Sequence, residues 1–232
     1  MSLFITFEGV EGSGKSTQIE MLHNTFVNMR LSVVKTREPG GTAVGDRLRS
    51  LLLEPSSTPF SAQTELLLYM AARAQLAKEV IAPALKSGTF VISDRYMDSS
   101  VAYQGYGRGV DLRFVKHLNK SVSNGSIPDF TVLLDLDPEI GLARISSRPL
   151  GIFRSGLSGL DRVESESLQF HRRVRKGYLI LAKENPERFV VVNGRESKEL
   201  IHKQIVHELM RRHGGRFPAN GSVNPNSSER SA

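Results

Sequence analysis

The sequence contains no cysteine and no tryptophan, and only 7% of its 232 residues are aromatic. Without cysteine, the chain cannot form disulfide bonds, cysteine-ligated metal sites or a thiol nucleophile. No apolar run approaches the roughly 20 residues that a membrane-spanning helix needs. No basic segment or signal-like core precedes the first apolar run, so we expect a cytoplasmic protein without a membrane partner.

Acidic residues are scarce relative to basic ones. The chain has 31 Lys and Arg against 24 Asp and Glu, which gives a net charge of +7. Nine of the basic residues but only three of the acidic ones lie between residues 141 and 183. This balance favours an anionic partner, either a nucleotide or a nucleic acid. The length suits one large α/β domain or two small ones.

Residues 9–17 read GVEGSGKST and match the phosphate-loop pattern G-x-x-x-x-G-K-[ST] at every fixed position. An apolar run over residues 3–7 precedes the loop and helical spacing follows it, which predicts a strand–loop–helix unit. In such a loop, backbone N–H groups surround phosphate oxygens, a lysine faces the terminal phosphates and a hydroxyl faces Mg²⁺. A chance turn before a helix is the alternative. We expect nucleotide-phosphate binding by nine consecutive residues, Gly9, Val10, Glu11, Gly12, Ser13, Gly14, Lys15, Ser16 and Thr17.

The rest of the chain alternates between strand-like and helix-like segments. Short apolar runs predict four further strands, over residues 32–36, 90–93, 130–136 and 189–192. Spacing and end signals predict helices over residues 43–53, 62–85, 111–122, 138–146 and 160–182, and a last one marked by Ile201, Ile205 and Leu209. Residues 99–109 start as a possible helix and dissolve into glycines. The order predicts an α/β fold, a five-stranded parallel sheet flanked by helices on both faces.

Two segments lack these periodic patterns. Residues 147–160 consist mainly of Ser, Gly, Arg and Leu, and we expect them to form a mobile loop. Residues 214–232 are rich in Gly, Ser, Asn and Pro, and we expect a disordered tail. The folded domain is therefore predicted to span residues 1–213.

Charged residues follow several of the predicted strands. The phosphate loop follows the first, Arg37-Glu38 the second and Asp94-Arg95 the third, so the three clusters converge on the carboxyl edge of the sheet. At that edge Asp94 can face a metal ion, and Arg95 can hold an acceptor phosphate with two hydrogen bonds. A surface ion pair is the alternative interpretation of Asp94-Arg95.

A phosphotransferase also needs cations around the phosphoryl group that is transferred. The phosphate loop supplies Lys15 but no arginine, so we expect residues 147–160 to supply another cation on closing. The candidates are Arg148 and Arg154. We favour Arg154, because Arg148 adjoins Pro149 close to the expected helix end. A solvated basic loop is the alternative.

Six further motifs follow the phosphate loop: TREPGG at 36–41, AARAQ at 71–75, DRY at 94–96, AYQG at 102–105, GRG at 107–109 and DRVE at 161–164. Together they resemble the bacterial type of thymidylate kinase, a family of P-loop nucleoside monophosphate kinases, over roughly residues 3–212. The resemblance implies a P-loop kinase fold with a lid loop at about 147–160. It also implies transfer of the ATP γ-phosphoryl group to dTMP for dTTP biosynthesis, with Mg²⁺, in a homodimer.

The resemblance assigns residues to the dTMP site. It implies that Tyr69 stacks on thymine, that Arg73 reaches the base and the acceptor phosphate, and that Gln104 bonds the base edge. For Tyr69, simple core packing is the alternative. Tyr103 would pack under the sugar, where a 2′-hydroxyl is unwelcome. The full predicted set is Glu11, Arg37, Tyr69, Arg73, Arg95, Ser100, Tyr103 and Gln104.

The resemblance also assigns the catalytic and metal residues. Glu11 would meet the sugar 3′-hydroxyl or the metal shell, and Ser16, Asp94 and Glu164 would serve the metal ion. The predicted catalytic set is Lys15, Arg95, Asp94, Glu11, Arg154 and Arg148. The lid departs from the compact bacterial form, since residues 149–153 make it several residues longer.

Two other functions stay open on the sequence. One is a kinase for another nucleoside or nucleotide. The other is a nucleic-acid-binding P-loop ATPase, but no nucleic-acid motif is present, so we expect no such partner. A GTPase is disfavoured, because Asn119-Lys120-Ser121-Val122 lacks the Asp of the guanine motif N-K-x-D.

Overall fold

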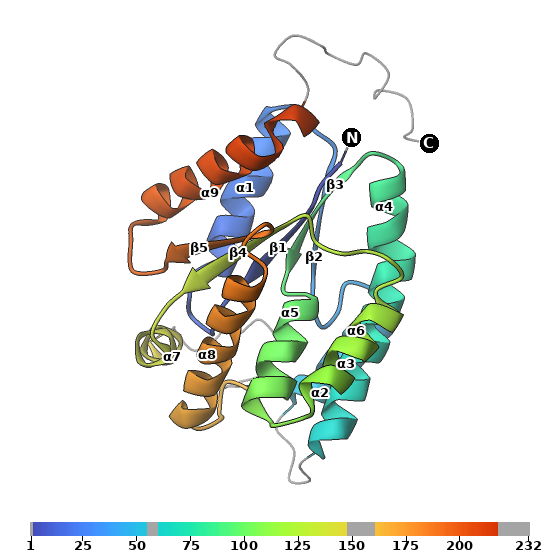
Figure 1. Ribbon diagram of the computed structural model, residues 1–232, viewed down its shortest axis with the longest axis vertical. Helices are drawn as coiled ribbons and strands as arrows, with labels where there is room; N and C mark the ends of the chain where they lie inside the picture. The colour runs from blue at the N-terminus through green and yellow to red at the C-terminus, as the bar shows by residue number, and fades with distance from the viewer. Residues whose placement is uncertain (1, 55–59, 148–160, 218–232) are drawn as a thin grey trace.

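The computed structural model describes residues 2–54, 60–147 and 161–217. Within them, five parallel strands form one sheet in the order β2-β3-β1-β4-β5 (Figure 1). The prediction of a five-stranded parallel sheet is confirmed. The strands are β1 (Phe4–Glu8), β2 (Val33–Arg37), β3 (Phe90–Asp94), β4 (Phe130–Asp135) and β5 (Phe189–Asn193).

Helices cover both faces of this sheet, with α1 and α9 on one face and α3, α5 and α8 on the other (Figure 1). Helix α3 runs on through a π-helical turn, Ala77–Ile81, into α4, so the predicted long helix over 62–85 is confirmed. The helices are α1 (Lys15–Asn28), α2 (Ala43–Leu53), α3 (Ala62–Leu76), α4 (Ala82–Lys86), α5 (Met97–Ser100), α6 (Leu112–Val122), α7 (Pro138–Ser146), α8 (Leu168–Glu184) and α9 (Lys198–His213).

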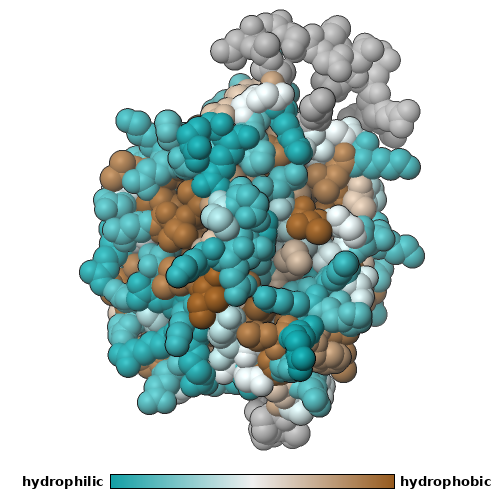
Figure 2. All heavy atoms as spheres, in the orientation of Figure 1, coloured by the Kyte–Doolittle hydropathy of each residue, from teal (hydrophilic) through white to brown (hydrophobic). Residues whose placement is uncertain are grey.

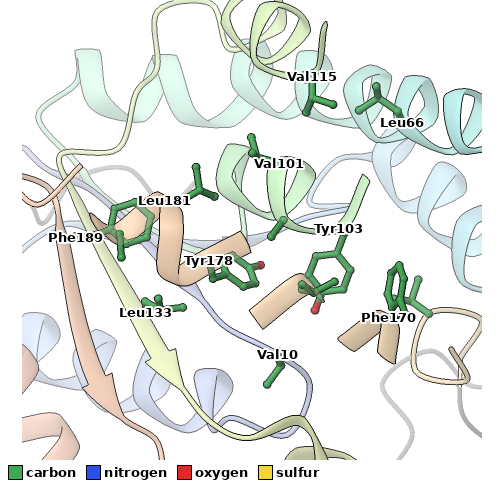
Figure 3. Close-up of a cluster of buried hydrophobic side chains, with 14 of the residues drawn as sticks. Val10, Leu66, Val101, Tyr103, Val115, Leu133, Phe170, Tyr178, Leu181 and Phe189 are labelled. Atoms are coloured by element: carbon green, nitrogen blue, oxygen red, sulfur yellow. The ribbon is translucent and has the colours of Figure 1, made fainter. Parts of the chain in front are cut away.

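The central strand β1 has an apolar core on each side. Ile5 and Phe7 point toward α1 and α9, where Ile205 and Leu209 also pack. Phe4, one residue out of phase, packs on the opposite face. A strand that is buried on both faces has a continuous apolar sequence. This is why apolar and polar residues do not alternate along β1. Figure 3 shows the larger cluster between the sheet and α8, including Tyr103, Phe170 and Tyr178.

Side-chain caps explain where several helices begin. Asp111 accepts hydrogen bonds from the backbone N–H groups of Arg113 and Phe114 and starts α6 as predicted. Thr42, Ser61, Ser167 and Ser197 cap α2, α3, α8 and α9 in the same way. Each such cap contributes about 1 kcal/mol and fixes the direction in which its helix leaves the preceding loop.

Two predicted helix boundaries are wrong. The helix expected from Leu160 begins only at Leu168, because Asp161 accepts hydrogen bonds from the N–H groups of Val163 and Glu164 and forms a turn there. The segment expected to dissolve into glycines instead continues from α5 as a π-helix, Val101–Gly107. Gly107 lies there for packing, since a Cβ on it would fall 2.7 Å from the Phe170 ring.

The chain stays ordered beyond the predicted domain end at residue 213. Gly214–Arg216 forms a 3-10 turn, so the expectation of disorder from 214 is wrong for the first residues of the tail. The Phe217 ring lies 5.6 Å from the Phe26 ring and 5.3 Å from the Phe90 ring, and it closes this end of the core. Residues 218–232 and 148–160, with the predicted lid, lie outside the described residues.

Polar and apolar side chains alternate over the surface in Figure 2, where brown patches show between larger teal areas. None of the helices in the described part of the chain is long and apolar enough to cross a membrane.

Candidate active site

One pocket opens where the strands β1, β2 and β3 end. The phosphate loop, the Arg37–Pro39 segment after β2 and the Asp94-Arg95 pair after β3 all line it. The predicted convergence of these three clusters at the carboxyl edge is therefore confirmed. Charged and polar side chains from other elements complete the lining, namely Arg49, Tyr69, Ser99, Tyr103, Gln104, Asp161 and Glu164.

Glycine is required in the phosphate loop by its backbone and by its neighbours. Gly9, Gly12 and Gly14 all have positive φ angles, of 136°, 68° and 98°. A Cβ on Gly12 would lie 2.2 Å from the carbonyl oxygen of Gly141 in α7. The loop leads directly into α1, whose N-terminus carries partial positive charge. This combination of close backbone and helix N-terminus suits a phosphate group.

Lys15 is buried in the centre of the loop. Its Nζ donates hydrogen bonds to the carbonyl oxygens of Gly9 and Val10, both at 2.9 Å. Burial, followed by the nearby Arg95 charge, lowers the pKa of Lys15 to about 8. The ammonium group is thus held at a fixed place in the loop and gains from any anion that enters beside it.

Arg95 connects the loop to the pocket. It has a φ angle of 70°, and its Nη1 donates to the Gly9 carbonyl at 3.0 Å and the Tyr178 hydroxyl at 2.9 Å. Its Nη2 donates to Glu11 Oε1 at 2.9 Å. Within the described residues, Nε and the second N–H of Nη2 have no acceptor. Arg95 therefore retains donors for a ligand in the pocket.

Glu11 is ionised despite its burial. Burial by itself raises the pKa of Glu11, but the charge of Arg95 and the buried His171 outweigh it and hold the pKa at about 2. The Nδ1 atom of His171 lies 3.2 Å from Glu11 Oε2. The Tyr103 hydroxyl donates to the other carboxylate oxygen of Glu11. Sequence reasoning missed His171, because a lone histidine on a helix carries no signal of its neighbours.

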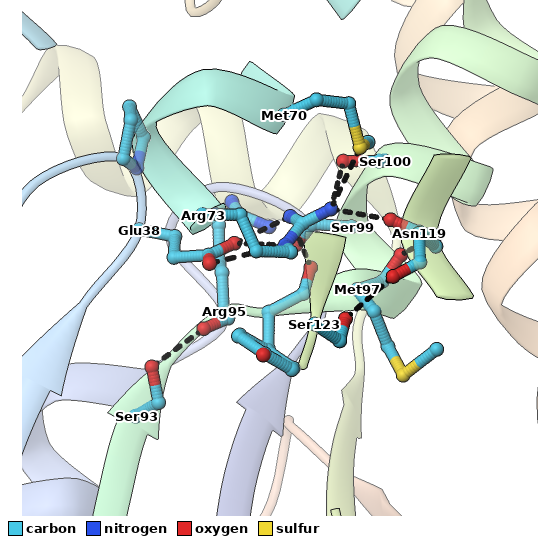
Figure 4. Close-up of polar contacts among 12 residues, drawn as sticks. Glu38, Met70, Arg73, Ser93, Arg95, Met97, Ser99, Ser100, Asn119 and Ser123 are labelled. Carbon is cyan, nitrogen blue, oxygen red and sulfur yellow. Dashed lines mark hydrogen bonds and ion pairs between the residues drawn. The ribbon is translucent and has the colours of Figure 1, made fainter. Parts of the chain in front are cut away.

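Arg73 does not line the pocket and is only 1% exposed. Its Nε and Nη2 form an ion pair with Glu38 (Figure 4). Its Nη2 also donates to the Tyr96 carbonyl at 3.0 Å. Nη1 donates to Ser100 Oγ at 3.0 Å and to Asn119 Oδ1. All five N–H groups are thus used within the protein. The structure thus places Arg73 behind the pocket wall, whereas the prediction from the sequence has it reach the base and the acceptor phosphate.

Ser100 is likewise buried and does not line the pocket. It is 1% exposed and accepts its hydrogen bond from Arg73, whereas the neighbouring Ser99 lines the pocket in its place. The Ser99 hydroxyl donates to Glu8 Oε2 at 2.6 Å. The helical turn of α5 decides which of the two serines faces the pocket, and that serine is Ser99 rather than the predicted Ser100.

Comparison with known proteins identifies the family of the chain. The model of the thymidylate kinase family matches residues 7–205. The thymidylate kinase of Maridesulfovibrio salexigens is 46% identical over 219 residues, which cover 94% of this chain and all of the relative. The thymidylate kinase of Halothermothrix orenii is 49% identical over 207 residues, 89% of this chain and 96% of the relative.

A crystal structure of a thymidylate kinase is also similar to this chain. The thymidylate kinase of Ehrlichia chaffeensis is 32% identical, with a TM-score of 0.71, and the match covers 90% of this chain and 98% of the other. The chain belongs to the thymidylate kinase family.

Three residues that the family resemblance assigned to the nucleoside of dTMP, Tyr69, Tyr103 and Gln104, line the pocket. Tyr69 of α3 is only half-buried and faces the pocket, which favours a ligand contact over core packing. Tyr103 and Gln104, both from the π-helix, lie beside it. Gln104 Nε2 donates to Glu65 Oε1 at 2.8 Å. An aromatic ring and an amide therefore lie together at this end of the pocket.

The acceptor-phosphate side contains a cation that sequence reasoning missed. Arg37 lines the pocket as predicted, with its side chain 54% exposed and its Nη2 3.3 Å from Asp46. Arg49 lines it too, and donates to the Pro39 carbonyl at 2.9 Å. Burial and the Arg37 charge lower the pKa of Arg49, as expected for cations clustered where an anion binds. The position of Arg49 in the sequence could have predicted this, because α2 begins directly after the loop at 37–41 and turns Arg49 back toward that loop.

The residues predicted to serve Mg²⁺ also share this pocket. Ser16, Asp94 and Glu164 all line it. These residues offer a hydroxyl and two carboxyl groups as metal ligands. Mg²⁺ prefers such oxygen ligands together with phosphate oxygens and water. The donor set therefore fits this ion. Arg148 and Arg154 lie outside the described residues.

Proposed function

We propose that this protein transfers the γ-phosphoryl group of ATP to dTMP, giving dTDP and ADP in dTTP biosynthesis. Family membership makes it a phosphotransferase acting on dTMP. The observation that carries the proposal is the position of Arg95. This residue bonds Glu11 and Gly9 of the phosphate loop and keeps unused donors in the pocket that Tyr69 and Gln104 also line.

The donor side of the pocket binds ATP through the loop from Gly9 to Thr17. The loop N–H groups and the α1 N-terminus hold the β- and γ-phosphates, and Lys15 compensates the charge that develops on the phosphoryl oxygens. Ser16, Asp94 and Glu164 hold Mg²⁺. When bound, this ion draws charge from the phosphate oxygens and aligns them.

The acceptor side binds dTMP. Arg95, Arg37 and Arg49 surround its phosphate, which places the attacking oxygen near the end of the phosphate loop. Tyr69 stacks on the base and Gln104 bonds its edge. Tyr103 packs beneath the sugar, and Glu11 accepts from the 3′-hydroxyl or joins the metal shell. Arg73 and Ser100 act only indirectly, by supporting the wall of the pocket.

A further cation completes the site. The described pocket contains Lys15 on the donor side and arginines on the acceptor side. Arg154, with Arg148 as the alternative, supplies a charge over the γ-phosphoryl group. If Arg154 acts on the transition state, Arg154→Ala should lower kcat and leave KM for dTMP nearly unchanged.

The protein is a cytoplasmic homodimer in this proposal. The family resemblance suggests the dimer, and exposed apolar side chains on the adjoining helices α2 and α3 support it. Val44 and Leu51 of α2 and Leu67 of α3 are between 47% and 52% exposed. Apolar side chains grouped on neighbouring helices are typical of surfaces that another chain covers.

A panel of phosphoryl acceptors tests the function. We expect ADP release with dTMP to be far faster than with dCMP, dAMP, dGMP or thymidine, in the presence of ATP and Mg²⁺. Lys15→Ala is the control for the donor site and should lower turnover by about 10²–10³-fold, comparable to the loss of one charge-stabilising donor.

Three outcomes would contradict the proposal. Faster turnover of another acceptor would identify a different nucleotide kinase. ATP hydrolysis that DNA or RNA stimulates, without any acceptor, would favour the P-loop ATPase. Near-normal activity of Lys15→Ala would show that the loop is not the donor site.

A further inference from the structure

Glu65 is a buried acid that does not line the pocket but contacts a residue that does. It lies on α3, is 2% exposed, and its Oε1 accepts a hydrogen bond of 2.8 Å from Gln104 Nε2. Arg108 Nε donates to the same oxygen at 3.2 Å. Arg162 Nη1 donates to Oε2 at 2.7 Å. The catalytic roles described above do not use this carboxylate.

The contact with Glu65 fixes which end of the Gln104 amide faces the pocket. A carboxylate only accepts hydrogen bonds, so the NH₂ end of the amide must point toward it. The Oε1 end then lies on the other side of the amide, and no described residue donates to it. That oxygen is also not among the buried polar atoms that lack a partner. The pocket side of Gln104 therefore presents an acceptor.

A glutamine amide that lacks such an anchor does not have a fixed orientation. Its oxygen and its NH₂ group have nearly the same shape, so a half-turn about the last bond exchanges them at little steric cost. Here, a half-turn would place Gln104 Oε1 against the Glu65 carboxylate and bring two acceptors together. Burial alone raises the pKa of Glu65, but the Gln104 hydrogen bond and the Arg108 and Arg162 charges outweigh it and lower the pKa. The anchor thus stays ionised at neutral pH.

The two orientations suit different pyrimidines. Thymine and uracil present an N3–H donor next to a carbonyl acceptor, whereas cytosine presents an N3 acceptor next to an amino donor. An amide oxygen that faces the base edge accepts from N3–H, and the flipped amide would suit cytosine instead. Uracil and cytosine have rings of the same size, and thymine adds only a 5-methyl group, so packing against Tyr69 alone separates these bases poorly.

We propose that Glu65 is a positioning residue that locks the Gln104 amide with its oxygen toward the pocket, so that the site selects a pyrimidine carrying N3–H over cytosine. This inference rests on the proposed function, which places the base of the acceptor at Gln104. It adds a determinant of base choice that lies behind the pocket wall.

Steady-state kinetics with dTMP and dCMP test the proposal. In Glu65→Gln, residue 65 can present either an oxygen or an NH₂ group, so the Gln104 amide is free to flip. The ratio of kcat/KM for dTMP to that for dCMP should fall about tenfold or more, with kcat/KM for dCMP rising. A parallel fall for both acceptors would show a merely structural role and overturn the proposal.

Glu166→Gln is the matched control. Glu166 forms an ion pair with Nη1 of the same Arg108 but does not contact Gln104. The dTMP to dCMP ratio should therefore stay at its wild-type value in this variant. If it falls as far as in Glu65→Gln, the effect comes from disturbing the arginine, and the proposal fails.

A double-mutant cycle assigns the effect to Gln104. Gln104→Ala should lose the discrimination by itself, and adding Glu65→Gln should then change the ratio no further. A second, independent loss in the double variant would overturn the proposal. Wild-type inactivity toward dTMP would instead refute the proposed function, so the two failures are distinguishable.

A measurement on the wild-type chain covers the case in which Glu65→Gln does not fold. In protein labelled with ¹⁵N at glutamine, the side-chain NH₂ protons of Gln104, identified by their loss in Gln104→Ala, should exchange with water about tenfold or more slowly than those of the exposed Gln63 and Gln169. Exchange as fast as in the exposed glutamines would show that the amide is not anchored.

Discussion

Arg73 and Arg95 differ in what they do with their hydrogen-bond donors. Both lie near the carboxyl edge of the sheet, and both resemble acceptor-binding residues of the family. Arg73 is 1% exposed, and all of its N–H groups bond to Glu38, Ser100, Asn119 and Tyr96. The Arg95 side chain is 17% exposed and keeps two N–H groups without an acceptor among the described residues.

A structural arginine can be told from a ligand-binding one by whether its N–H groups are already used within the protein. A buried ion that has every donor satisfied cannot take a ligand without breaking bonds that it already makes, and losing one partner leaves the other charge uncompensated. An ion with spare donors beside a cavity gains when an anion arrives. Arg95 also has a φ of 70°, which is uncommon outside glycine and is often found at functional sites.

Replacing Arg73 gives the largest expected effect on stability. Arg73→Met leaves Glu38 buried without its ion-pair partner, so the free energy of unfolding should fall by about 3–5 kcal/mol. Denaturant titration measures it. Adding Glu38→Gln removes the stranded charge and should recover part of the loss. A stable Arg73→Met that fails to bind dTMP would restore the sequence expectation that Arg73 contacts the ligand.

Replacing Arg95 should affect ligand binding instead. In Arg95→Ala, the phosphate of dTMP loses charge-assisted hydrogen bonds that are worth about 1.5–3 kcal/mol. Calorimetric titration should show a large loss of dTMP affinity and a much smaller loss of ATP affinity. Equal losses for both ligands would mean that Arg95 serves the phosphate loop as much as the acceptor, and the contrast with Arg73 would weaken.

Glu8, a buried carboxyl group near Arg95, gives a smaller effect, which is a dependence of the free energy of unfolding on pH. Burial, followed by the nearby Asp98 charge, raises the pKa of Glu8 to about 7, against the effects of Arg95, Ser99 and Tyr178. A carboxyl group whose pKa rises on folding contributes stability below its unfolded pKa, and this contribution is lost as the pH rises through the folded pKa. The free energy of unfolding should therefore fall by about 1–3 kcal/mol between pH 5 and pH 8.

Glu8→Gln should remove most of this slope, because the amide does not titrate. Denaturant titrations at several pH values measure it, with Glu199→Gln as the control. The Glu199 side chain is 67% exposed, so its replacement should leave the slope unchanged. If the slope persists in Glu8→Gln, other groups produce it and Glu8 is ionised in the folded protein.

The sequence was informative wherever the signal was local. The phosphate loop needs glycines at positive φ and a following helix, and both requirements can be read within residues 9–28. The strands were predictable because burial on both faces demands continuous apolar runs. Asp111 and Pro138 also showed where α6 and α7 begin.

Helix ends were predicted less well where turn chemistry competed with helical spacing. Helical spacing suggested a helix from Leu160, but the Asp161 side chain accepts hydrogen bonds from the backbone of the next residues, and the helix begins only at Leu168. The glycines at 105 and 107 suggested a loop, although they allow Leu112 and Phe170 to pack closely against a π-helix. Glycine has both uses, and only the neighbours distinguish them.

The sheet, the phosphate loop and the set of charged segments at the carboxyl edge could be predicted from the sequence, because each depends on residues close together along the chain. Tertiary structure alone decided which charges face one another. Glu38 and Arg73 are 35 residues apart, and Glu65 and Gln104 are 39 apart. Whether an arginine binds a ligand or a buried carboxylate depends on how the helices pack around it. That packing follows from apolar contacts throughout the chain, which no short motif records.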